Sequence, residues 1–98
     1  MFNYKLAKWK KKRLHILKID GYKDKIAARY GRTVEATHVH HIYPAEAYPE
    51  YAFCDWNLIS VSAGTHNMLE NRMTGELTAM GQQLMDDTVP GKDWRKKE

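Results

Sequence analysis

The stretch from Thr37 to Pro44 constrains the fold of this chain more than any other. It carries three of the five histidines among β-branched and aromatic residues and stops at a proline, as a short strand does. Side chains along a strand alternate between its two faces, so His38 and His40 share one face while His41 points to the other. Neighbouring histidines on opposite faces suggest two different chemical roles.

The pattern of apolar residues predicts two helices before this strand. Residues 5–19 combine one apolar side with many cationic positions, which is typical of an amphipathic helix, and Asp20-Gly21 ends it. Residues 25–30 predict a second, short helix. The strand that carries the histidines is then expected over residues 34–42.

A second strand and two more helices complete the expected order. Residues 58–61 form a short, mainly apolar run that is reached through a long irregular connection. A helix is expected from about residue 66 to 73, with Thr65 as its N-cap, and another over about 76–86. The tail from Val89 onward is basic, and we expect it to be loosely ordered.

Composition narrows the class of protein. The 98 residues contain no internal repeat or linker, which predicts a single domain over 1–98 with a central unit at about 33–74. The 16 Lys and Arg against 12 Asp and Glu favour an anionic partner, nucleic acid before an acidic peptide. The single Cys54 excludes an intrachain disulfide, and no apolar run approaches the roughly 20 residues of a membrane span. With no apolar signal-peptide core at its start, we expect a soluble, cytoplasmic protein.

Four residues in a fixed order carry the chemical interpretation, namely His40-His41, then Asn57, then His66. Together with their flanking segments they resemble the His-Asn-His (HNH) endonuclease family, in particular its small standalone bacterial and phage members. The resemblance implies an α+β fold with a ββα-metal core, in which two antiparallel strands and a helix surround one metal ion, flanked here by N-terminal and C-terminal helices. It spans about residues 20–72, and the flanking segments that support it are 39–44, 48–50, 56–60 and 66–67.

The resemblance also implies a role for each of these residues. His40 and His66 match the ligands of one divalent ion (Mg²⁺, Mn²⁺, Ni²⁺ or Zn²⁺), His41 matches the general base, and Asn57 matches the residue that orients the loop between the strands. A metal-bound imidazole nitrogen cannot also accept a proton from water, so ligand and base must be different residues. Both histidines reach one site only if the strand bends or ends near them, which Pro44 favours.

Glu70 and His38 are further candidates for the metal site. Glu70 follows His66 by four residues, and some relatives use such a position for a third ligand, although an acid at this spacing is also common on a solvated surface. His38 shares the face of His40, and it is a ligand, a partner of a ligand, a phosphate contact or simply a hydrogen-bonded strand residue.

Cationic residues supply the candidate contacts to DNA. Arg72 follows His66 by one to two helical turns and either neutralises phosphate charge or lies in solvent. The helix at 5–19 adds a cationic run that either tracks a phosphate backbone or forms a solvated face, namely Lys10, Lys11, Lys12 and Arg13. We therefore expect DNA as the partner and no membrane.

The chain departs from many relatives in one respect, because it lacks the two Cys-x-x-Cys pairs that hold a structural zinc. Those positions correspond to Asp24, Ala27, Ser62 and Thr65, and alanine cannot bind zinc, so we expect no structural zinc. Structural zinc can contribute on the order of 10 kcal/mol to folding. We expect apolar packing of residues 26–30 against the strands and the last helix to replace it.

The leading hypothesis is a metal-dependent DNA endonuclease, nicking one strand or cutting both, that uses His41 as its base. The alternative is a non-catalytic nucleic-acid-binding module on the same fold, which the basic residues fit equally well. A closed metal-storage site would need four protein ligands. Two histidines with Glu70 or His38 leave open positions, as a catalytic metal requires.

Overall fold

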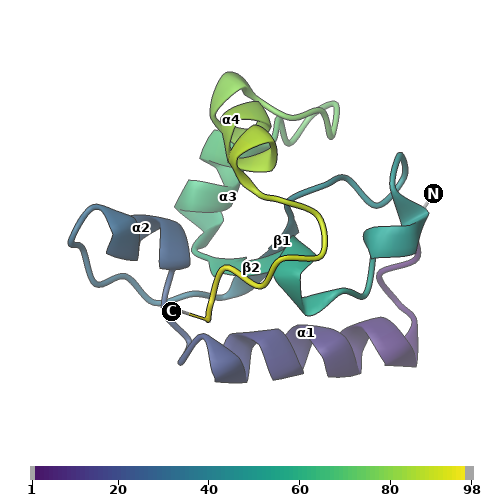
Figure 1. Ribbon diagram of the computed structural model, residues 1–98, viewed down its shortest axis with the longest axis horizontal. Helices are drawn as coiled ribbons and strands as arrows, with labels where there is room; N and C mark the ends of the chain where they lie inside the picture. Colours follow the sequence, from purple (N-terminus) through teal and green to yellow (C-terminus); the bar gives the residue numbers. More distant parts are fainter. Residues whose placement is uncertain (1, 97–98) are drawn as a thin grey trace.

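The computed structural model describes residues 2–96, in which a two-stranded sheet lies between helices (Figure 1). β1 and β2 pair antiparallel, with His40 opposite Ile59. The predicted α+β class, with an antiparallel strand pair followed by a helix, is confirmed. The elements in chain order are α1 (Ala7–Ile19), α2 (Lys25–Arg29), β1 (His38–His41), the 3₁₀ turns Pro49–Tyr51 and Asp55–Asn57, β2 (Leu58–Val61), α3 (Ala63–Leu69) and α4 (Ala79–Asp87).

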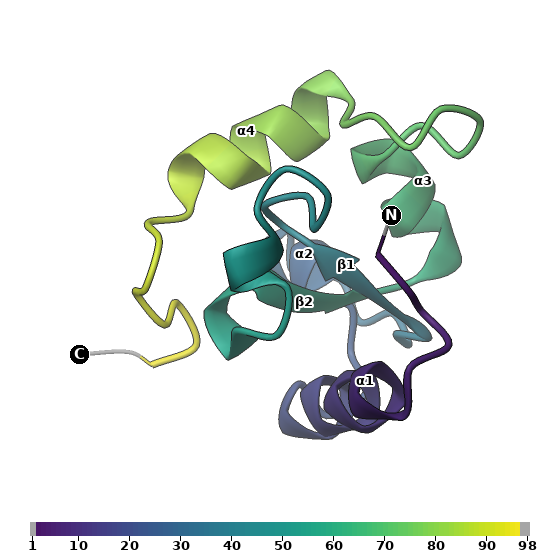
Figure 2. The ribbon, with the colours of Figure 1, turned by 90° about the vertical axis from the view of Figure 1, so that its right-hand side faces the viewer.

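The two faces of the sheet build two separate apolar clusters. α1 lies along one face, while α3 and α4 lie on the other (Figures 1 and 2). Fully burying one large aliphatic or aromatic side chain stabilises a fold by about 1.5–3 kcal/mol, so both clusters matter in a chain of this size. On the α1 side the cluster contains Trp9, Ile16, Leu17, Ala36, Val39 and Leu58. On the α3 side it contains Ile26, Ile42, Ile59, Val61, Leu69 and Leu84.

The first strand is shorter than predicted, because the residues before it pair with a different segment. Val34 O accepts a hydrogen bond from Asp24 N at 2.8 Å, and Ala36 N donates to Tyr22 O at 2.8 Å. The predicted strand over 34–42 is therefore wrong at its N-terminal end. Only residues 38–41 pair with β2, which the sequence placed correctly at 58–61.

The predicted helix over 66–73 is wrong at both ends. The N-cap of α3 is Ser62, whose side chain accepts a hydrogen bond from Thr65 N at 3.1 Å, so the helix begins three residues before the expected start. It ends at Leu69 because Glu70 is extended and forms a bridge with Leu77. That bridge also delays α4, which begins at Ala79 instead of residue 76.

The C-terminal tail is anchored where we expected a loose segment. Trp94 Nε1 donates to Trp56 O at 2.8 Å. Arg95 binds Asp20 with a shortest distance of 2.6 Å and donates to Asp55 O at 2.7 Å. The segment after α4 thus passes across the sheet region and ties the chain end to α1 (Figure 1). The last two residues of the predicted tail, Lys97 and Glu98, lie outside the described residues.

A hydrogen-bonded group, here called the Asp24 cluster (Asp24, Ala27, Ser62 and Thr65), occupies the positions of the missing cysteines. Asp24 Oδ1 accepts from Ile26 N and Ala27 N, both at 2.9 Å, and Oδ2 accepts from Ser62 N at 2.8 Å. Burial alone would raise the pKa of Asp24, but hydrogen bonds from Thr65, Ala27 and Ser62 outweigh it and lower the pKa. A buried carboxylate thus joins the starts of α2 and α3, whereas we expected apolar packing alone.

Tyr30, which we expected in that packing, is 73% exposed, so this part of the prediction is wrong.

Helix α1 begins at Ala7, two residues after the predicted start. No helix within residues 2–96 has both the length and the apolar character needed to cross a membrane.

Candidate active site and metal group

His40 lies in β1 and is almost completely buried, with 1% of its surface exposed. Neither ring nitrogen has a hydrogen-bond partner within the described part of the chain. Burial, helped by the nearby His66, lowers the pKa of His40 to about 3, so the imidazole is neutral at physiological pH. A buried polar atom without a partner costs about 1–3 kcal/mol, and a metal ion would satisfy one nitrogen.

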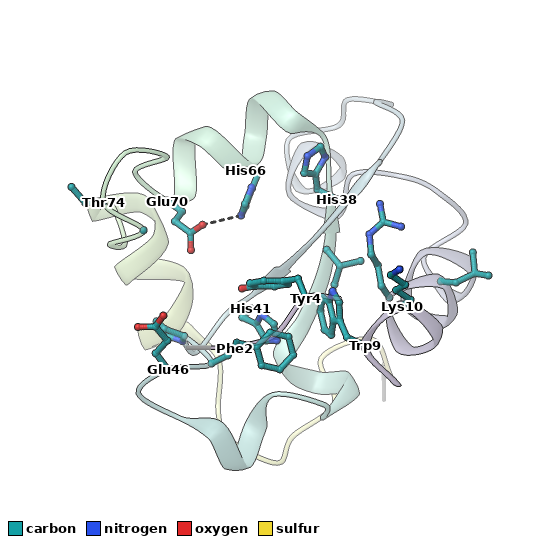
Figure 3. A pocket seen from close by; sticks show the side chains of 16 residues that line it. Phe2, Tyr4, Trp9, Lys10, His38, His41, Glu46, His66, Glu70 and Thr74 are labelled. Carbon is teal, nitrogen blue, oxygen red and sulfur yellow. Dashed lines mark ion pairs between the residues drawn. The ribbon is translucent and has the colours of Figure 1, made fainter. Parts of the chain in front are cut away.

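Two further side chains lie close to His40, namely His66 in α3 and Glu70, the residue that follows the end of α3. These three residues are here called the metal group (His40, His66 and Glu70). Their three ligand atoms lie within 4.8 Å of one another. Ligands about 2.1 Å from one ion lie no more than about 4.2 Å apart, so small side-chain movements would close the group on an ion. His66 Nε2 lies 3.3 Å from Glu70 Oε2, as the dashed line in Figure 3 marks. That hydrogen bond is the main cause that lowers the pKa of Glu70.

His38 shares the strand face of His40 but does not belong to the metal group. Its side chain is exposed, and its Nδ1 lies 2.8 Å from Thr37 Oγ1. Partial burial, His66 and Arg13 together lower its pKa. The structure therefore brings Glu70 close to His40 and His66, whereas His38 lines the pocket outside this group (Figure 3).

His41 faces the other side of β1 and is held on two sides. Its Nε2 lies 3.0 Å from Ala52 O, and its ring stacks on Trp9 with centroids 4.8 Å apart and an interplanar angle of 22°. Burial lowers the pKa of His41, although the hydrogen bond to Ala52 opposes the shift. The ring is 6% exposed, yet it lines the same pocket as His66 and Glu70. Of the two adjacent histidines, His41 lines this pocket directly, whereas His40 lies buried on the opposite face of β1, beside the pocket residues His66 and Glu70.

Asn57 is fully buried and ties together the connection between the strands. Its Oδ1 accepts from Tyr43 N at 2.7 Å, and its Nδ2 donates to Tyr43 O at 3.0 Å and to Tyr51 O at 3.1 Å. Tyr51 immediately precedes Ala52, the residue whose carbonyl contacts His41. Asn57 therefore reaches the histidine through the backbone of this loop, without a direct contact to the metal group.

Comparison with known proteins identifies a solved structure with a similar fold. No family model and no curated protein matches the chain. Among solved structures, it is similar to the HNH endonuclease of the deep-sea thermophilic bacteriophage GVE2, which was solved with a manganese ion. The two are 26% identical, the match covers 65% of this chain and 70% of that one, and the TM-score is 0.64. The chain therefore has an HNH-type fold.

This HNH-type fold carries a pocket of about 920 Å³ between the metal group and the N-terminal region. Aromatic residues that we did not predict as site residues form its second wall, namely Phe2, Tyr4 and Trp9. In the sequence, Trp9 looks like an ordinary apolar residue of an amphipathic helix, and Phe2 and Tyr4 precede the predicted helix, so no pattern indicated that these residues line a site. Their position follows from the N-terminal segment, which runs from the start of α1 back beside the end of β1, where the Phe2 ring centroid lies 5.0 Å from that of His41.

The cationic run of this HNH-type chain divides between two faces of α1. Lys10 and Arg13 line the pocket, and Arg13 donates to the carbonyl of Thr37. Lys12 turns away and pairs with Asp55 at 2.7 Å, which lowers the pKa of that carboxyl against the effect of burial. Lys11 is exposed and does not line the pocket. The four residues therefore do not form one continuous track, and Lys10 and Arg13 are the two that line the pocket shared with His66 and Glu70.

Arg72 is exposed in the turn after α3 and does not line the pocket. We expected it on the helix, one to two turns after His66, but α3 has already ended at Leu69. Its expected helical position is therefore wrong, and its contact with phosphate stays a prediction.

Proposed function

We propose that this chain is a metal-dependent endonuclease that hydrolyses phosphodiester bonds of DNA. The observation that carries the proposal is the buried His40, whose two nitrogens have no partner in the described chain and which lies beside His66 and Glu70. A neutral imidazole, a second imidazole and a carboxylate fit a single divalent ion and leave positions for water and a phosphate oxygen. When bound there, such an ion would stabilise negative charge on the phosphate and on the departing oxygen.

His41 is the proposed general base. A carbonyl oxygen can only accept a hydrogen bond, so the contact with Ala52 O requires the proton to be on Nε2 and leaves the lone pair on Nδ1. That nitrogen can take a proton from water, and stacking on Trp9 restricts the ring from turning away. Asn57 would act as a positioning residue, because it fixes the loop that carries the Ala52 carbonyl.

DNA is the proposed substrate because the pocket combines a metal group with cationic residues at its rim. Lys10 and Arg13 line the pocket and are the proposed contacts to phosphates near the scissile bond, and the whole chain carries a formal charge of +4. Contacts of this kind release counterions, so binding is expected to weaken steeply as salt increases. The similarity to a phage HNH endonuclease supports the same substrate class.

Nicking of supercoiled plasmid, measured in Mg²⁺, Mn²⁺, Ni²⁺ and Zn²⁺, tests the proposal. Wild type should nick in at least one metal and stop on chelation, and His41→Ala should nick about 10²- to 10⁴-fold more slowly because the base is lost. The matched control is His15→Ala, since His15 is an exposed histidine that contacts Asp55 and does not line the pocket. Equal rates for wild type and His41→Ala would sink the assignment of the base. Salt-sensitive binding without nicking in any metal would make the chain a nucleic-acid-binding module instead.

A further inference from the structure

The pocket has two chemically different walls (Figure 3). One presents the imidazoles of His38 and His66 and the carboxylate of Glu70, while the other presents the aromatic side chains of Phe2, Tyr4 and Trp9. Its volume of about 920 Å³ lies at the upper end of the roughly 300–1,000 Å³ of small-molecule sites. A phosphodiester group uses only the polar wall. The aromatic wall suits the part of a nucleotide that has flat apolar faces, which is the base.

Two of the three aromatic residues are already used by the fold. Trp9 is 4% exposed and stacks on His41. Phe2 packs against the core around Trp9 and contacts Phe53 with ring centroids 5.6 Å apart. Tyr4 differs from both, because 56% of its surface is exposed.

The ring of Tyr4 is open to a stacking partner. Its three aromatic neighbours meet it at interplanar angles of 71°, 80° and 62°, and no ring of residues 2–96 stacks on it in parallel. No hydrogen bond from its hydroxyl is found in the described structure. Because no ring of residues 2–96 covers it in parallel and 56% of its surface is exposed, part of the Tyr4 ring is available to a ligand.

Tyr4 also lies beside the proposed chemistry. Its ring centroid is 6.1 Å from that of His41, and Figure 3 places it between His41 and the pair formed by His66 and Glu70. Burial, Glu70 and Glu46 raise the pKa of its hydroxyl, which agrees with a position facing the carboxylates. A nucleotide whose phosphate lies between the proposed base and the metal group would have to contact this ring.

We propose that Tyr4 stacks on a nucleobase next to the scissile phosphate, and that this base is one not stacked within an intact duplex. The inference rests on the proposed nuclease function for its choice of ligand. In a duplex both faces of each base are covered by its neighbours, so the site would favour single-stranded DNA or a duplex with an unpaired nucleotide. Lys10 and Arg13 at the pocket rim supply charge for the adjoining backbone. Replacing a base-stacking aromatic residue by alanine typically weakens binding about 5- to 150-fold.

The test compares two probes that carry the same phosphates, an oligothymidylate and an abasic oligodeoxyribose phosphate of equal length. Affinities are measured in a His41→Ala background, so that neither probe is cut during the measurement. Adding Tyr4→Ala should weaken binding of oligothymidylate about tenfold and leave binding of the abasic probe unchanged. Tyr4→Phe and Tyr4→Trp should keep the difference between the probes. Tyr30→Ala is the matched control, since this exposed tyrosine does not line the pocket.

The remaining outcomes overturn the inference in distinct ways. Equal losses on both probes would mean that Tyr4 supports the fold or contacts the backbone, and unchanged affinity would mean that it does not touch the nucleic acid. Tighter binding by Tyr4→Ala would identify the ring as a plug in the pocket. Cleavage is tested separately, by wild type acting on single-stranded and duplex DNA. Failure of all cleavage would count against the nuclease proposal, while the affinities would still decide the role of Tyr4.

Discussion

Helix α3 joins two polar groups that differ in how completely their atoms are paired. At its start, the carboxylate of Asp24 is buried and accepts three backbone hydrogen bonds between 2.8 and 2.9 Å. Further along, His66 belongs to the metal group, where His40 is equally buried but has no partner on either nitrogen within residues 2–96. A paired polar group contributes to stability, whereas an unpaired one lowers stability until a ligand satisfies it.

This difference assigns separate tasks to the two groups. The Asp24 cluster is a structural group, because it connects the start of α2 to the start of α3. It thereby fixes the helix that presents His66. The metal group is the one place where the fold retains an unsatisfied buried ligand atom among the described side chains. Stability and metal binding should therefore respond to different substitutions.

The largest expected effect is the loss of metal binding in His40→Ala. Removing a residue that only supports a ligand costs roughly 10- to 100-fold in metal affinity, so removing a proposed ligand should cost more than 100-fold. Wild type should gain about 2.7 kcal/mol of stability at a metal concentration 100 times the Kd, and the variant should not. Calorimetric titration with Mn²⁺ and thermal unfolding with and without the ion measure both quantities.

Loss of the buried His40 imidazole could also alter the packing around β1, so a second variant is needed to separate loss of metal binding from loss of packing. His66→Ala changes a side chain that is 27% exposed, and it should abolish metal binding without a cavity in the core. His38→Ala is the contrast, because His38 stands outside the metal group and its loss should change the Kd by less than tenfold. If His38→Ala weakened the ion as much as His66→Ala, the proposed ligand set would be wrong.

Asp24→Ala is expected to lower the stability of the fold and to leave metal binding nearly unchanged. The substitution removes the N-cap of α2 and leaves Ser62 N without its acceptor, which together should lower the free energy of unfolding by about 2–3 kcal/mol. The Kd for the metal in the folded protein should change by less than tenfold. Urea unfolding gives the first quantity and titration at low temperature the second. Asp86→Ala is the control, since Asp86 is exposed and accepts a side-chain hydrogen bond from Gln82 at 2.9 Å on the surface of α4.

The sequence predicted the fold because its strongest signals are local. β2 was predicted at its observed bounds from four consecutive residues, and the order His40-His41, Asn57, His66 indicated the HNH-type fold. The predicted start of helix α3 was wrong because residues far away in the sequence determine where this helix begins. Ser62 and Thr65 are both suitable N-caps, and the choice falls on Ser62 while its backbone N donates to Asp24, 38 residues earlier.

The same limit applies to the site. The spacing of Glu70 and His38 left the third ligand open. Glu70 joins the group from an extended position just after α3, where it pairs with Leu77, and the sequence did not predict this end of the helix. The tail seemed unstructured in sequence because Arg95 finds its carboxylate 75 residues away, at Asp20. Tyr4 likewise gave no local signal. The catalytic roles of His41 and Asn57 stay predictions that the nicking experiment tests.

The smallest expected effect concerns acid, and it follows from the lowered pKa of Asp24. Because the folded protein favours the charged carboxylate, this group contributes stability above its ordinary pKa of 3.8, and the contribution is lost as pH falls through that value and then through the lower pKa of the folded state. One group can change stability by at most about 1.4 kcal/mol per pH unit. The test is urea unfolding of wild type and Asp24→Asn from about pH 6 to about pH 3, which reaches the range where carboxylates titrate. The difference between their free energies of unfolding should shrink as the pH falls.

The matched comparison is Asp55→Asn, because the pKa of Asp55 is also lowered, by Lys12 against the effect of burial. Its side chain is 40% exposed, so water and salt screen the pair and its pH-dependent contribution should be the smaller of the two. Adding salt should reduce the Asp55 contribution and leave that of Asp24 nearly unchanged, since its hydrogen bonds are short-ranged and buried. Parallel curves for wild type and Asp24→Asn across this range would show that the carboxylate is not held in its charged form. The Asp24 cluster would then owe its stability to capping geometry alone.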